Sequence, residues 1–412
     1  MVRLEPVPGS KQPSTRHRRI RTVVYLDHAA TTPVRPEARA AMLAAPSGNP
    51  SSLHASGRAA RRSVEESRET VAELLDAEPG DVQFTSGGTV ADNLAVRGVF
   101  AARQQDRLRP LVLVSAVEHH AVLDAAEALT VSGAQVLLIP VDPDCRLRLE
   151  SVAELLRTRA DDVALVSVMS ANNEVGTGQP LAELAALLEP HGIPLHTDAV
   201  QSVGWWGAPG VTSAAVSLSA HKFGGPIGSG ALVLPTSIDC RPIVFGGGQE
   251  RQLHSGTLDP VGAAGMAAGL AAARASAGES GTVGVSVAQL KEDLAQVILT
   301  ADPEAEILTP TVGALPNILS VAFPECESDA LLMLLDAGGV ECSAGSACTA
   351  GIPRPSHVVA AMGREDVARS VLRFSLGWTS TTQDVATVGE VLPEAVSRAR
   401  RAGRRSLARS GT

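Results

Sequence analysis

Short apolar runs alternate with helical patterns through the first two thirds of the chain. The runs are rich in Val, Leu and Ile, which is typical of strands that are buried on both faces. Between them apolar residues recur every three or four positions, as in amphipathic helices. The runs that we assign to strands are 82–84, 111–114, 135–139, 163–169, 193–197, 214–218 and 230–234. This alternation predicts an α/β fold whose mostly parallel, seven-stranded sheet is covered by helices on both faces.

The pattern changes after a long helix rich in Ala and Gly over residues 261–277. Gly278-Glu279-Ser280-Gly281 interrupts the helix, and the apolar runs beyond it are 317–323, 340–343 and 371–376. Residues 1–22 combine basic side chains with Pro and Gly, a composition typical of a mobile terminus. We therefore expect a flexible extension over 1–22, a large domain over 23–277 and a smaller α+β domain over 278–412.

Composition narrows the class of protein. With 412 residues and 44% hydrophobic residues, the chain can bury a sizeable core, and its net charge of -9 argues against direct binding of nucleic acid. Its five cysteines are scattered without the spacing of a zinc site or a disulfide framework. No run reaches the roughly 20 apolar residues of a membrane span, and no apolar h-region of a signal peptide follows the basic N-terminus. We expect a cytoplasmic protein without a membrane segment.

Lys222 is hard to explain as a structural residue, because it follows a strand that is predicted to be buried. It ends Ser219-Ala220-His221-Lys222, between the apolar run 214–218 and the glycine-rich stretch 224–230. A lysine there is either one that extends to the surface from a strand end or a partly desolvated, easily deprotonated amine. Such an amine condenses with aldehydes, and pyridoxal phosphate is the commonest aldehyde cofactor held in this way.

Other strand ends deliver polar residues to the same edge, where open parallel sheets bind ligands. The segment Thr85-Ser86-Gly87-Gly88-Thr89 is either a plain turn or a cradle of backbone amides for a phosphate. Asp198 is either a helix cap or a carboxylate that keeps a pyridine nitrogen protonated. His119 is either a core histidine or a flat stacking surface. The other candidates at this edge are Asn172-Asn173-Glu174 and Gln201.

Three motifs occur here in one order: Tyr25-Leu26-Asp27-His28-Ala29-Ala30-Thr31-Thr32-Pro33, Ser219-Ala220-His221-Lys222 and Gly345-Ser346-Ala347-Cys348-Thr349. With them the chain resembles the cysteine desulfurases of the NifS and IscS type, in the class V aminotransferase family of fold type I pyridoxal-phosphate enzymes. The similarity extends from about Tyr25 to Trp378. It implies a homodimer that converts L-cysteine to L-alanine and transfers the sulfur to an enzyme cysteine as a persulfide.

The resemblance also implies roles around pyridoxal 5'-phosphate. Lys222 would bind the cofactor covalently and move protons at the substrate Cα, while His119 would stack on the ring and act as an acid or base. Asp198 would pair with the ring nitrogen and Gln201 with the phenolic oxygen. The residues expected at the phosphate are Gly88, Thr89, Ser219, His221 and, from the partner subunit, Thr257.

For the substrate, the resemblance implies that Arg373 binds the carboxylate with Asn173 and Asn49. Cys348 would attack the substrate sulfur, and its small neighbours suit a mobile loop. Its alternative is a buried core cysteine, which is what we expect of Cys342. The chain departs from the family pattern at Val90-Ala91, Ile227 and His254, and the last departure touches the subunit boundary beside the phosphate.

Two kinds of alternative remain at this point. One is another class V enzyme, such as a selenocysteine lyase or a cysteine sulfinate desulfinase, and Cys348 discriminates because those reactions proceed without the thiol. The other is a cofactor-free scaffold for sulfur-carrier proteins, against which Lys222, Asp198, Gln201 and His119 weigh together. A sulfur-acceptor protein is the expected partner, for example in iron–sulfur cluster assembly, but the sequence does not name it.

Overall fold

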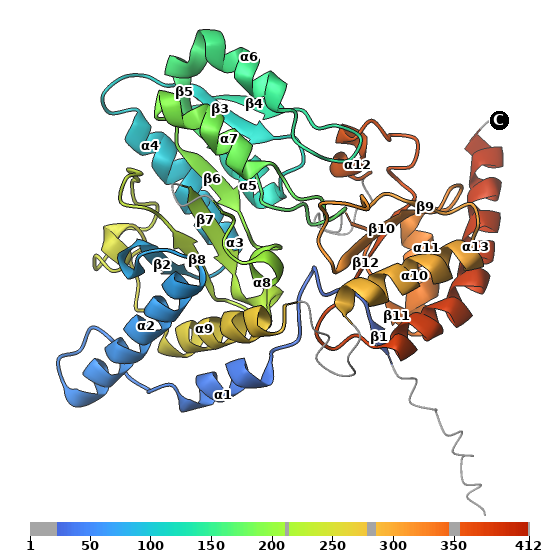
Figure 1. The fold of residues 1–412 in the computed structure, drawn as a ribbon, viewed down its shortest axis with the longest axis horizontal. Helices are drawn as coiled ribbons and strands as arrows, with labels where there is room; N and C mark the ends of the chain where they lie inside the picture. The colour runs from blue at the N-terminus through green and yellow to red at the C-terminus, as the bar shows by residue number, and fades with distance from the viewer. Residues whose placement is uncertain (1–22, 211–213, 278–285, 346–354, 411–412) are drawn as a thin grey trace, which may run out of the picture.

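The computed structural model describes residues 23–210, 214–277, 286–345 and 355–410, with side chains up to residue 403. Its central element is a seven-stranded sheet of order β2-β8-β7-β6-β5-β3-β4 (Figure 1). The strands are β2 (Val82–Thr85), β3 (Leu111–Ser115), β4 (Gln135–Ile139), β5 (Val163–Ser167), β6 (Leu195–Asp198), β7 (Ala215–Ser219) and β8 (Gly230–Val233). The predicted strands and fold class are thereby confirmed.

The direction of the strands decides where the polar strand ends meet. The pairs β3–β4, β3–β5, β5–β6 and β6–β7 are parallel, and β8 is antiparallel to both of its neighbours, β2 and β7. Since β2 therefore runs in the same direction as β7, the carboxyl ends of β2, β3, β5, β6 and β7 share one edge of the sheet. The predicted candidate residues follow these ends.

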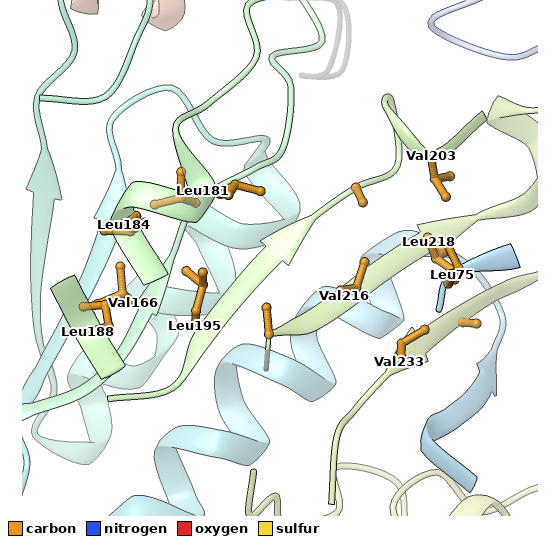
Figure 2. Packing of buried hydrophobic residues seen from close by; sticks show 14 of the residues in the cluster. Leu75, Val166, Leu181, Leu184, Leu188, Leu195, Val203, Val216, Leu218 and Val233 are labelled. Atoms are coloured by element: carbon orange, nitrogen blue, oxygen red, sulfur yellow. The ribbon is translucent and has the colours of Figure 1, made fainter. Parts of the chain in front are cut away.

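Successive residues of one strand enter different hydrophobic clusters, because side chains alternate across a sheet. On β3, Leu111 and Leu113 pack in one cluster, while Val112 and Val114 pack in the other. The first cluster is covered by α2 (Ala55–Leu74), α6 (Leu149–Arg159), α7 (Leu181–Leu188) and α9 (Pro260–Ala275). Figure 2 shows Leu181, Leu184 and Leu188 of α7 beside Val166 and Leu195 of the sheet. The other cluster is covered by α3 (Gly88–Asn93), a π-helical turn Leu94–Gly98, α4 (Val99–Arg103) and α5 (His120–Glu127).

The C-terminal part has its own core. Strands β12 (Val371–Ser375), β10 (Ile318–Ala322) and β9 (Glu306–Ile307) form an antiparallel sheet. Helices α10 (Val287–Ala301), α11 (Ser328–Gly338) and α13 (Thr382–Ser410) pack with it, and α12 (His357–Ala361) lies in a smaller cluster. None of the described helices is long and apolar enough to cross a membrane.

The first described strand belongs to this C-terminal core. β1 (Val24–Tyr25) pairs in parallel with β11 (Val340–Glu341), and Val24 and Leu26 are buried in the same cluster as β10 and β12. The chain then runs through residues 27–35 to α1 (Pro36–Ala44), which packs against α9. The boundary expected at residues 277 and 278 stays a prediction, because 278–285 lie outside the described residues.

Candidate active site

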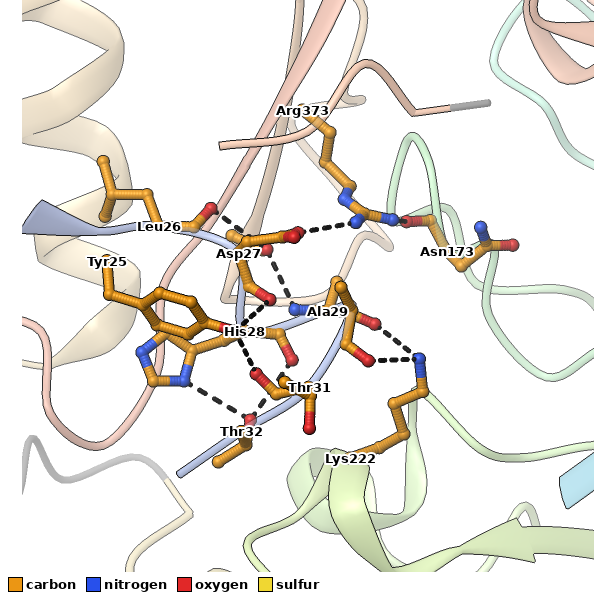
Figure 3. A network of polar contacts seen from close by, with 12 residues as sticks. Tyr25, Leu26, Asp27, His28, Ala29, Thr31, Thr32, Asn173, Lys222 and Arg373 are labelled. Carbon is orange, nitrogen blue, oxygen red and sulfur yellow. Dashed lines mark hydrogen bonds and ion pairs between the residues drawn. The ribbon is translucent and has the colours of Figure 1, made fainter. Parts of the chain in front are cut away.

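The segment 27–32 links the two cores across the carboxyl edge of the large sheet. On one side it bonds to β12: His28 N–H donates to Ser375 O at 3.1 Å, and Ala29 N–H donates to Ser375 Oγ at 2.9 Å. On the other side Thr32 N–H donates to the carbonyl of His221 at 2.8 Å, just after β7. The motif that begins at Tyr25 therefore forms one wall of the candidate site (Figure 3).

Lys222 lies at the same edge, at the end of the 3-10 turn Ala220–Lys222 that follows β7. Its Nζ donates to Ala29 O at 2.8 Å and to Ala30 O at 3.0 Å, so the amine points at the segment 27–32 (Figure 3). Gln201 Nε2 donates to the same Ala29 oxygen at 2.9 Å. The structure thus brings Lys222 and Gln201 together at one carbonyl, as the sequence predicts for neighbours in a site.

Two half-buried histidines beside Lys222 are held uncharged at neutral pH. Burial and the nearby charge of Lys222 lower the pKa of His119 and of His221, each to about 4. His119 Nδ1 accepts the backbone N–H of Ala121 at 3.1 Å at the start of α5, which fixes the ring and places the proton of the neutral form on Nε2. A flat, neutral imidazole near the lysine suits stacking on an aromatic ring.

Asp198 contributes a buried carboxyl group to the same edge of the sheet. It ends β6 and is buried, and burial raises the pKa of its carboxyl to about 6, although the Val200 N–H and the charge of Lys222 oppose this rise. The Val200 bond, to Oδ1, is 2.9 Å long. A carboxyl in these surroundings gains by facing a protonated nitrogen, because a buried carboxylate needs a positive partner.

The start of α3 forms a close-fitting turn next to Ser219. A Cβ on Gly88 would lie 2.9 Å from Val200 Cγ2 and 3.3 Å from Ser219 Cβ, so a larger residue would push into the site. Thr89 is exposed and Ser219 is buried. The backbone amides at this helix start are the donors that suit a phosphate. His221, the remaining predicted phosphate residue, shares a 3.1 Å hydrogen bond with Thr31 Oγ1.

Arg373 on β12 faces this edge from the C-terminal core. One terminal nitrogen pairs with Asp27 Oδ1 at 2.8 Å, and the other donates to the backbone oxygen of Asn173 at 2.9 Å. Among the described residues its buried Nε has no hydrogen-bond partner. It is the carbonyl of Asn173 that contacts Arg373, and Figure 3 shows the amide of Asn173 pointing away.

Two predicted residues are not joined to this group by the described contacts. Asn49 lies exposed in the loop between α1 and α2, where its Oδ1 accepts the Ser51 N–H at 2.9 Å. Thr257 is exposed before α9. Cys348 lies outside the described residues. Cys342 is buried in the C-terminal cluster, and burial raises the pKa of its thiol, so the prediction of a core cysteine is confirmed.

Sequence reasoning gave no role to several residues that the structure places here. Asp27 lies in a quoted motif, but its partner Arg373 is 346 residues away in the chain, so no local signal identifies the pair. Beneath Asp198, His196 contacts Ser167 Oγ at 2.8 Å, Ser217 Oγ at 2.9 Å and Asp92 Oδ1 at 3.6 Å. The alternation of strand residues places His196 on the same face of β6 as Asp198, a signal that could have identified it.

The chain is similar to a known protein family and to several known proteins. The profile of the family described as aminotransferase class-V matches residues 24–388. The chain belongs to this family. It is 46% identical over 400 residues to an IscS-like cysteine desulfurase of Mycobacterium tuberculosis, covering 92% of this chain and 98% of that protein. It is 43% identical to a cysteine desulfurase of Cereibacter sphaeroides, covering 92% of this chain and 96% of that protein.

A solved structure agrees with these relatives. A protein described as NifS-like superposes with a TM-score of 0.82 at 32% identity, covering 91% of this chain and 99% of that chain. The resemblance drawn from the three motifs is therefore confirmed. This member of the class-V aminotransferase family is an enzyme of a pyridoxal-phosphate-dependent group, with cysteine desulfurases as its relatives.

Proposed function

We propose that the chain is a cysteine desulfurase that converts L-cysteine to L-alanine and passes the sulfur to Cys348. The observation that carries this proposal is the arrangement at the sheet edge. Lys222 Nζ donates to Ala29 and Ala30 on the segment 27–32, and Arg373, whose Nε is unpaired among the described residues, is bound to Asp27 of the same segment. An amine and a guanidinium group that both contact this short segment suit the two ends of an amino-acid substrate.

The donor set fits pyridoxal 5'-phosphate. Gly88 leaves room beside Ser219 that a Cβ would fill, Asp198 is a buried acid that a protonated ring nitrogen would stabilise, and His119 is a neutral ring. Gly88, Thr89, Ser219 and His221 would hold the phosphate, and Asp198 the ring nitrogen. When bound, the cofactor supplies an electron-accepting ring that weakens the bonds at the substrate Cα and Cβ.

Each residue of the site has its own proposed role in the reaction. Lys222 would hold the cofactor covalently and would move a proton at the substrate Cα. His119 would stack on the ring and serve as an acid or base, while Gln201 would donate to the phenolic oxygen. Arg373 orients the substrate carboxylate through charge-assisted hydrogen bonds, with Asp27 holding its guanidinium in place. Asn173 and Asn49 complete the carboxylate site.

Cys348 receives the sulfur. Its thiolate attacks the substrate sulfur, a sulfur–sulfur bond forms as the Cβ–S bond breaks, and protons replace sulfur at Cβ and return to Cα. Cysteine and an enzyme thiol thus yield alanine and an enzyme persulfide, with atoms balanced and no outside oxidant. We infer that the protein acts in the cytoplasm as a homodimer, with Thr257 binding the phosphate across the subunit boundary, and that a sulfur-acceptor protein takes the persulfide sulfur.

Substitution of Lys222 tests whether its amine binds the cofactor. We expect Lys222→Ala to abolish the visible absorbance of the bound cofactor, while Lys291→Ala keeps it. Lys291 is a matched control because its Nζ also donates to a backbone carbonyl, Leu315 O at 2.9 Å, and the proposal gives it no contact with the cofactor. A Lys222→Ala protein that retains the absorbance, with borohydride fixing the cofactor to another lysine, would contradict the assignment.

Tests on Cys348 distinguish a cysteine desulfurase from the alternative enzymes. After incubation with L-cysteine, mass spectrometry should find an added sulfur atom on Cys348 in the wild type and in Cys240→Ser. Cys348→Ser should bind the cofactor yet release no sulfide in the presence of a thiol reductant. Undiminished turnover by Cys348→Ser would instead favour a selenocysteine lyase or a cysteine sulfinate desulfinase.

A further inference from the structure

Three consecutive residues without a glycine adopt left-handed backbone conformations in the loop before α9. The φ angles are 48° at Glu250, 56° at Arg251 and 64° at Gln252. Side chains of L-residues clash with the backbone in this region, so a run of three persists only where other contacts enforce it. This left-handed turn, residues 250–252, lies five residues before Thr257.

A buried ion pair enforces the turn. The Glu250 side chain is only 1% exposed, and its carboxylate accepts from the two terminal nitrogens of Arg68 at 2.9 and 2.8 Å and from the Phe84 N–H at 2.6 Å. Arg68 belongs to α2 and also donates to Val82 O at 2.6 Å. The carboxylate of one strained residue is therefore bound to both α2 and β2.

Hydrogen bonds on the two sides of the turn join it to the Thr257 segment. Gln249 Oε1 accepts the Gly256 N–H at 3.0 Å, and Ser255 Oγ accepts the Gly248 N–H at 3.2 Å. Gly256 has a φ of 149°, which only glycine adopts readily, and Thr257 follows it at the surface. The place of Thr257 thus depends on the loop that Glu250 anchors.

The same ion pair lines a cavity of about 420 Å³ on this face of the molecule. Pro50, Ser51 and Leu258 also line it, and these are the chain neighbours of Asn49 and Thr257. Asn49 and Thr257, which are both exposed, therefore lie next to residues that line one hollow. Their common position agrees with a role toward a second copy of the chain.

We propose that Arg68 and Glu250 are positioning residues: their ion pair holds the left-handed turn so that Thr257 reaches the cofactor phosphate in a second copy of the chain. This inference rests on the proposed function, in which Thr257 binds that phosphate. In this arrangement neither Arg68 nor Glu250 would touch the cofactor or the substrate.

A double-mutant cycle on cofactor binding tests the proposal. The dissociation constant of pyridoxal phosphate is measured by absorbance titration of the full-length apoprotein for wild type, Arg68→Lys, Thr257→Ala and the double variant. We expect each single change to raise the constant about tenfold, the worth of a charge-assisted hydrogen bond. The double variant should bind no more weakly than the weaker single variant. Once Arg68→Lys has displaced Thr257, the threonine makes no contact with the phosphate that Thr257→Ala could remove.

Arg400→Lys is the matched control, since Arg400 forms a two-bond ion pair with the buried Asp302 in the C-terminal core. It should leave the dissociation constant unchanged. If Arg68→Lys does not fold, Glu250→Gln, of nearly equal size, takes its place in the cycle.

The outcomes distinguish the two proposals. Losses that multiply in the double variant, or an unchanged constant in Arg68→Lys beside a raised one in Thr257→Ala, would overturn the positioning role alone. An unchanged constant in Thr257→Ala would overturn both the phosphate role of Thr257 and the inference built on it, while leaving the roles of Lys222 and Cys348 open to their own test.

Discussion

His28 shows how a single side chain supports the wall of the site. It is 2% exposed and lies between Thr32 Oγ1, 3.3 Å from Nδ1, and Thr379 Oγ1, 3.1 Å from Nε2. Burial and the charge of Arg35 lower its pKa from 6.5 to about 4. The neutral ring therefore joins the segment 27–32 to the loop after β12, and protonation would place an uncompensated charge in the core.

The lowered pKa predicts how stability changes with acidity. Since the folded pKa lies below the unfolded value, the contribution of His28 is complete above pH 6.5 and is lost as the pH falls through 4, by roughly 3 kcal/mol at most. We expect the free energy of unfolding of His28→Gln, measured in urea, to fall less steeply over this range than that of wild type. The exposed His191 is the control, and an identical pH profile of His28→Gln and wild type would contradict the prediction.

Among the elements, α9 is rich in Ala and Gly because it packs unusually close to its neighbours. A Cβ on Gly269 would lie 2.8 Å from the backbone nitrogen of Gly225, and a Cβ on Gly265 would lie 2.6 Å from Met42 Cγ on α1. The loop at Gly224 and Gly225 directly follows Lys222. The helix therefore limits how closely this loop, and with it the amine of Lys222, can approach α9.

A methyl group on that helix face should therefore disturb the site. We expect Gly269→Ala to lower the free energy of unfolding by about 2 kcal/mol, because backbone atoms cannot yield as a side chain does, and to weaken cofactor binding. Gly389→Ala on α13 is the control: its new methyl meets only Val297 Cγ1, at 3.0 Å, the end of a side chain that can turn. Equal stability of the two variants in urea would show that α9 is free to move.

The elements of the large sheet could be predicted because each strand carries its own local signal. Runs such as 111–114 and 163–169 are apolar on both faces, and the strand ends identified Lys222, Asp198 and His119 as members of one edge. Contacts between distant segments carry no such signal. Neither the pairing of β1 with β11 nor the bond from Arg373 to Asp27 leaves a trace in the local pattern. The left-handed run at Glu250 is equally hidden, since it depends on Arg68 in α2.

At the scale of the whole molecule, Thr257 and Asn49 are exposed at the surface of one chain, and the proposed homodimer therefore has a testable arrangement. Co-expressed Lys222→Ala and Thr257→Ala chains should form mixed dimers in which one site has both an intact lysine and an intact threonine. We expect these dimers to recover about half of the wild-type turnover at low cofactor concentration, where Thr257→Ala alone is weak. Turnover no higher than that of Thr257→Ala diluted with inactive chain would show that the threonine serves its own subunit.

The hydrogen bonds that the segment 27–32 donates to Ser375 have a consequence for biosynthesis. Ala29, whose carbonyl receives Lys222, is itself fixed by Ser375. A ribosome releases Lys222 long before it has made that serine, so a nascent chain already containing the large sheet still lacks the support for its reactive nitrogen. If the proposed function holds, cofactor binding should accordingly occur late, after translation.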